Sequence, residues 1–82
     1  MDIREKALQV IIKRAAEVFS VDPATLNEGT SLEGDLKAKS ANIVQITTVL
    51  EDEFDVEVPY MDFKRKKTFG EAAAYVEQLV EG

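Results

Sequence analysis

The sequence contains neither cysteine nor histidine. Without cysteine there is no disulfide, no thiolate metal site and no cysteine nucleophile. Histidine is the usual general base near neutral pH and the commonest transition-metal ligand, so its absence excludes serine–histidine catalysis and the usual zinc sites. We therefore expect that the protein is not an enzyme, has no catalytic residues and binds no metal ion.

Long hydrophobic runs are also missing. No apolar run approaches the ~20 residues that span a bilayer, and the N-terminal residues have mixed charge instead of the apolar stretch of a signal peptide. The net charge of −6 argues against non-specific binding to nucleic acid. We expect a cytoplasmic monomer without stable membrane insertion, and a single domain over residues 1–82 because this length leaves no room for a second.

The spacing of apolar residues predicts an all-α fold. Apolar side chains recur at helical spacing in four segments, which are residues 2–19, 40–54, 60–66 and 68–81. Met61 and Phe63 are the expected anchors of the short third segment. Many β-branched residues in the second segment favour a strand, but the helical period and the length decide for a helix. The result is a small four-helix bundle with three longer helices and one short helix before the last.

The segments between these helices carry turn residues. In the long loop of residues 20–39, an Asp-Pro pair predicts a short turn of helix at residues 23–26. Leucines spaced along the loop are expected to hold it on the core, and these are Leu26, Leu32 and Leu36. Residues 55–59 end in proline, which disfavours a helix before it, so this segment is predicted to be extended.

Ser40 stands where the long loop meets the second long helix. One interpretation is a helix cap, whose hydroxyl accepts a hydrogen bond from an early helical N–H group. The other is an attachment point, because an anion tied to this hydroxyl would meet free N–H groups and the positive end of the helix dipole. The two roles are compatible, and the serine taken alone favours the cap.

Three motifs accompany Ser40 in the sequence. Asp35-Leu36 precedes it, Leu50-Glu51-Asp52-Glu53-Phe54 ends the predicted helix, and Pro59 ends the segment that follows. This arrangement resembles the pattern of acyl carrier proteins, which runs Asp-Leu-Gly-x-Asp-Ser-Leu, continues with a helix that ends in Leu-Glu-x-x-Phe, and then has an extended segment that ends in proline. The resemblance covers nearly the whole chain, and it implies the four-helix bundle of the acyl-carrier type.

The resemblance also implies a function for Ser40. In this family the serine carries 4′-phosphopantetheine through a phosphodiester, and the terminal thiol of the arm holds an acyl group as a thioester. The implied partners are a phosphopantetheinyl transferase and the acyl-transferring, condensing or ligase enzymes of one pathway. The arm would supply the thiol that a chain without cysteine lacks.

The chain departs from the family pattern beside this serine. Lys37 replaces the glycine, Lys39 the aspartate and Ala41 the leucine. Asn42 and Gln45 replace acidic residues that partner enzymes recognise. We expect partner recognition by a surface that consists of Lys37, Lys39, Ala41, Asn42, Val44, Gln45, Thr48, Glu51 and Asp52. Its neutral to positive charge near the serine favours a specialised lipid, polyketide or related pathway over general fatty-acid synthesis.

Other interpretations of function remain open. Val44-Gln45-Ile46 and residues 59–66 are similar to D-alanyl carrier proteins, which leaves an aminoacyl or D-alanyl cargo open. The lysine before the serine favours instead an unmodified helical interaction module with a carrier-like fold. The acidic residues of segment 51–57 lack the ligand spacing and the central glycine of an EF-hand loop, which disfavours a calcium module.

Two further features of the sequence have alternatives. The basic run at residues 64–67 is either a solvated face or a contact for an acidic partner or an anionic membrane surface. The apolar stripes either only hold the bundle together or also open to shelter an acyl chain.

Overall fold

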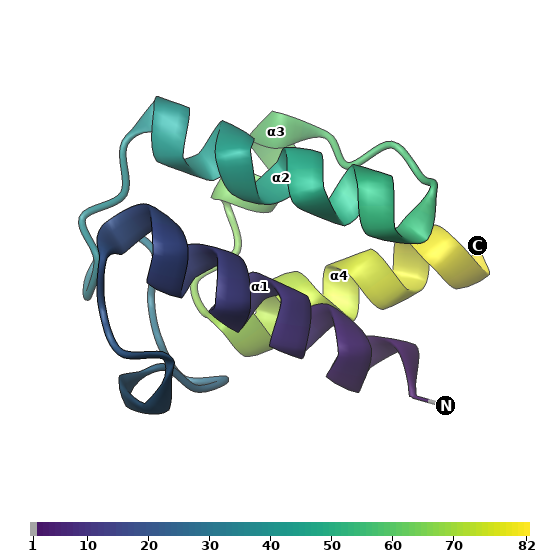
Figure 1. Ribbon diagram of the computed structural model, residues 1–82. Coiled ribbons are helices and arrows are strands. Elements are labelled where there is room, and N and C mark those ends of the chain that lie inside the picture. The colour runs from purple at the N-terminus through teal and green to yellow at the C-terminus, as the bar shows by residue number, and fades with distance from the viewer. Residues whose placement is uncertain (1) are drawn as a thin grey trace.

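The computed structural model describes residues 2–82, which form four α-helices and one short 3-10 turn (Figure 1). In chain order the elements are α1 (Ile3–Phe19), the 3-10 turn η1 (Pro23–Thr25), α2 (Ser40–Phe54), α3 (Tyr60–Lys64) and α4 (Phe69–Glu81). The described residues contain no strand. The predicted all-α bundle is therefore confirmed. No helix within residues 2–82 combines the length and the apolar character needed to cross a bilayer.

The bundle is built around α1. This helix packs against both α4 and α2, and α3 packs on α2 (Figure 1). The inward face of α1 carries Ala7, Ile11 and Ala15, which are fully buried. The other helices close the core with side chains that are at most 2% exposed, namely Ile43, Ile46, Leu50, Phe63, Phe69, Ala72, Ala73 and Val76. The predicted apolar stripes of the longer helices therefore meet in one core.

The long loop between α1 and α2 is held on that core. Its spaced leucines are buried or half-buried, as predicted, and these are Leu26, Leu32 and Leu36. The loop is also tied to α4, because the N–H groups of Phe69 and Gly70 donate to the carbonyl groups of Thr30 (2.9 Å) and Glu28 (2.8 Å). A Cβ atom on Gly70 would lie 3.1 Å from that Glu28 oxygen, so glycine allows the close approach. The predicted turn at residues 23–26 is η1.

The segment after α2 turns back along that helix. It begins at Asp55, which has a left-handed backbone (φ 54°), and it has no regular structure up to Pro59. Val58 is only 3% exposed, and its N–H donates to Oε2 of Glu51 at 2.9 Å. This bond holds the returning segment against α2, so that α3 begins near the start of α2.

The helix α3 is shorter than predicted and has one buried anchor instead of two. It ends at Lys64, and Phe63 is fully buried, as expected. Met61, the second expected anchor, is 55% exposed, so that prediction was wrong. Side chains that are two residues apart in a helix point in directions that differ by about 200°. Met61 and Phe63 therefore cannot both face the core.

Candidate functional site

Ser40 is the first helical residue of α2, and its side chain is exposed. The interpretation of Ser40 as the cap was wrong, because the capping position is occupied by Lys39 in an extended conformation (φ −98°, ψ 168°). Oδ1 of Asn42, in the first turn of α2, accepts a hydrogen bond from the N–H of Lys39 at 2.9 Å and so stabilises the start of the helix. A lysine side chain has no acceptor. The early N–H groups of α2 thus remain available to another acceptor.

A second hydroxyl lies beside Ser40. The phenol of Tyr60, the first residue of α3, donates a hydrogen bond to Oγ of Ser40 at 2.9 Å. Tyr60 is half-buried, and it packs against the core. The sequence pattern did not single out this residue. The available signal was the length of the segment of residues 55–59. Fully extended, it can reach roughly 17 Å back along α2, which is roughly 22 Å long, and so bring Tyr60 toward the start of α2.

The turn before Ser40 depends on two residues of the loop. Lys37 has a left-handed backbone (φ 52°), a conformation that glycine adopts without a steric penalty. Lysine at this position therefore carries about 1–2 kcal/mol of backbone strain, which the glycine of the resembled pattern would avoid. Oδ2 of Asp35 accepts the N–H of Ser31 at 2.8 Å and so closes the loop that leads to α2.

The charges around Ser40 favour an anion. Lys37 and Lys39 are exposed, and the first turn of α2 contains no acidic residue. The positive end of the dipole of α2 lies at the same place. A phosphate joined to the hydroxyl of Ser40 would therefore meet cations and N–H donors, which suits the chemistry of a phosphodiester.

Two large apolar side chains near the starts of α2 and α3 are exposed. Val44 lies one helical turn after Ser40 on α2 and is 46% exposed. Met61 follows Tyr60 on α3 and is 55% exposed. Val44 lies on the same face of α2 as Ser40, so a molecule that docked over Ser40 would also cover apolar surface there.

The other residues of the predicted recognition surface extend along α2. Exposed among them are Ala41, Gln45, Thr48 and Asp52. Asn42 and Glu51 are half-buried, and each accepts a backbone N–H, from Lys39 and Val58 respectively. Asn42 thus holds the backbone just before α2, and Glu51 holds the segment that follows α2.

The described residues offer Ser40 no metal site. Within residues 2–82, no group of three or more histidine, cysteine, aspartate or glutamate side chains is placed to hold an ion. Tyr75 of α4 contacts α3 at Asp62. Burial raises the pKa of the Tyr75 phenol, and the nearby Asp62 carboxylate adds to the rise. Tyr75 donates a hydrogen bond to Oδ2 of Asp62 at 3.4 Å and has no bond to Ser40.

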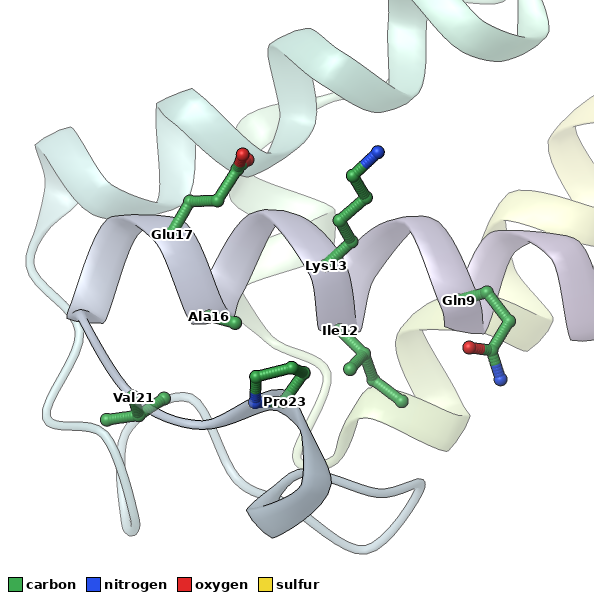
Figure 2. Close-up of a pocket in the computed structure, with 7 residues that line it drawn as sticks. All are labelled: Gln9, Ile12, Lys13, Ala16, Glu17, Val21 and Pro23. Carbon is green, nitrogen blue, oxygen red and sulfur yellow. The ribbon is translucent and has the colours of Figure 1, made fainter.

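An open hollow lies elsewhere on the surface, along α1 (Figure 2). It has a volume of about 400 Å³ and is lined by Gln9, Ile12, Lys13, Ala16, Glu17, Val21 and Pro23. In Figure 2, Ile12 and Pro23 face the hollow, whereas the charged ends of Lys13 and Glu17 extend away from them. Its lining includes none of the residues around Ser40, so the hollow is separate from the candidate site.

Comparisons with known proteins match the chain to a family model and to several relatives. The family described as "Phosphopantetheine attachment site" matches residues 9–76, which include Ser40. The chain is 35% identical over 78 residues to an acyl carrier protein of Bdellovibrio bacteriovorus, and the match covers 95% of each chain. It is 38% identical over 61 residues to an acyl carrier protein of Lactobacillus acidophilus, across 74% of this chain and 76% of that relative. A third acyl carrier protein, from Lactobacillus johnsonii, is 32% identical over 72 residues, across 88% of this chain and 90% of the relative.

Proposed function

The chain belongs to the acyl carrier protein family, and from this membership we propose that Ser40 carries a 4′-phosphopantetheine arm and presents acyl or related groups to partner enzymes. Phosphopantetheine is the cofactor of this family, whose members are carriers and not catalysts. When bound, the arm supplies the thiol that the chain itself lacks. The observation that carries the proposal is the exposed hydroxyl of Ser40 at the first residue of α2.

The residues around Ser40 fit the phosphate of such an arm. Lysine side chains and a helix N-terminus without acidic residues lower the free energy of an anion there. The exposed position also leaves Oγ accessible to a transferase. The protein needs no base of its own, because the transferase would take the proton of the serine hydroxyl.

The proposal is tested by attachment of the arm, which we call loading. The purified protein is incubated with coenzyme A and a broad-specificity phosphopantetheinyl transferase, and its intact mass is measured. We expect a mass gain of one arm, located on the tryptic peptide of residues 40–64, in which Ser40 is the sole serine. The proposal fails if transferases of several specificities give no gain, or if the arm is found on another peptide.

We further propose that the surface beside Ser40 selects partners of a dedicated pathway. In the family pattern, an aspartate and acidic helix residues stand where this chain has Lys39, Asn42 and Gln45. Charges at the rim of an interface mainly govern encounter rates and the rejection of wrong partners. Cognate partners should therefore present neutral or acidic groups to this surface, around an apolar contact with Val44 and Met61. A lipid, polyketide or related pathway, or an aminoacyl cargo, is compatible with this surface.

A charge exchange at Lys39 tests this selection. Lys39→Asp should raise the kcat/KM for loading by a general transferase with a basic docking surface about five- to tenfold, and less at high salt. Because aspartate also caps helices, Lys39→Asn serves as a capping control with half the charge change. Lys13→Asp, an equal charge change on α1, should leave the rate unchanged. Equal rates for all these variants would show that Lys39 does not select the transferase.

A further inference from the structure

The hydrogen bond between Tyr60 and Ser40 joins two helices that begin 20 residues apart in the sequence. The ring of Tyr60 packs against the core, and its hydroxyl lies 2.9 Å from Oγ of Ser40. The packing of Tyr60 against the core restricts the orientations open to its side chain. In the absence of this bond, an exposed serine at a helix start would sample several rotamers.

The chemistry of loading gives this bond a consequence. In loading, Oγ of Ser40 forms a bond to the phosphorus of coenzyme A that bears the pantetheine group. The bond between that phosphorus and the oxygen of adenosine 3′,5′-bisphosphate breaks, and the serine proton passes to a base of the transferase. The phenol of Tyr60 occupies one lone pair of Oγ, which leaves the other lone pair for attack and the serine proton free to be removed.

We propose that Tyr60 is a positioning residue for the attachment site, an inference that rests on the proposed function of Ser40. Before loading, its phenol holds Oγ of Ser40 in the orientation that the transferase uses. After loading, Oγ is a bridging ester oxygen and a weak acceptor. The phenol then donates to a non-bridging oxygen of the phosphodiester, and so ties the arm to α3 as well as to α2.

The contacts of α3 argue against a purely structural role for this bond. Phe63 is fully buried and fixes α3 on the core without the help of the phenol. The N–H of Phe63 donates to the carbonyl of Pro59 at 3.0 Å, which completes the turn that holds Tyr60. The side chain of Asp62 is contacted by Tyr75 from α4. The hydroxyl of Tyr60 adds little to this anchoring, and the atom it contacts is the one to be modified.

The test compares Tyr60→Phe with Tyr75→Phe, a matched control. Each variant removes one phenol hydroxyl that donates a side-chain hydrogen bond. Tyr60 donates to Ser40, whereas Tyr75 donates to Asp62 of α3. We expect Tyr60→Phe to lower kcat/KM for loading roughly three- to tenfold, with Tyr75→Phe close to wild type. In the loaded protein, Tyr60→Phe should also shift the ³¹P resonance of the phosphodiester, whereas Tyr75→Phe should not.

The outcomes separate this inference from the proposed function. Equal loading rates and equal ³¹P shifts for wild type and Tyr60→Phe would overturn the inference and leave the carrier function in place. Equal losses in the two variants would also overturn it, because the bond would then act through the general stability of α3. A wild-type protein that no transferase loads would overturn the proposed function and the inference with it.

Discussion

Replacing Ser40 with alanine is expected to abolish loading completely while the bundle stays folded. The variant lacks the oxygen that forms the phosphodiester, and the chain has only two other serines, Ser20 and Ser31. Ser40 does not cap α2, and alanine is the best helix former, so the usual expense of a lost cap does not apply. The loss of the bond to Tyr60 should change the free energy of unfolding by about 1 kcal/mol or less. Intact mass and urea unfolding measure the two effects.

Ser31→Ala is the control for this result. Oγ of Ser31 accepts the N–H of Gly34 at 2.8 Å, so its loss disturbs the loop but not the candidate site. Ser31→Ala should therefore load fully. A mass gain in Ser40→Ala equal to that of wild type would contradict the assignment of the site. If Ser40→Ala instead keeps all partner binding and cellular function, the protein acts as the unmodified interaction module considered as the alternative.

The extent of α2 shows what sequence periodicity determines well. The segment is rich in β-branched residues, whose propensity favours a strand, yet α2 spans Ser40–Phe54 as predicted. Ile43, Ile46 and Leu50 are almost fully buried on one face of the helix. The burial of this face outweighs local propensities that differ by less than about 1 kcal/mol per residue. Apolar spacing therefore identified the three longer helices from the sequence, whereas it overestimated the length of α3 and wrongly made Met61 an anchor.

The contacts of Ser40 show what the sequence could not determine. Several hydrogen-bond arrangements can start a helix with similar free energy, and the choice of Asn42 in place of Ser40 depends on the backbone of Lys39. The contact with Tyr60 depends on how the segment after α2 folds back, which Val58 and Glu51 fix through burial and one hydrogen bond. Such a contact is set by tertiary packing, and the length of the segment before Tyr60 does not determine it alone.

The helix α3 gives the largest expected effect on stability. It has only five residues, too few to be stable alone, and its sole buried side chain is Phe63. Phe63→Ala should lower the free energy of unfolding by about 3–5 kcal/mol, because a large cavity remains in the core. A domain of this length is stable by only about 4–12 kcal/mol. Urea unfolding followed by circular dichroism would measure the loss.

Met61→Ala is the matched control, because Met61 lies on the same short helix but is 55% exposed. Its replacement should change stability by less than about 0.5 kcal/mol, and Phe63→Leu should fall between the two. The same comparison bears on the candidate site. Tyr60 begins α3, so a Phe63→Ala protein that stays folded but frees α3 should lose the contact with Ser40 and load more slowly, as Tyr60→Phe does. Loading at the wild-type rate with α3 released would mean that Ser40 is presented by α2 alone.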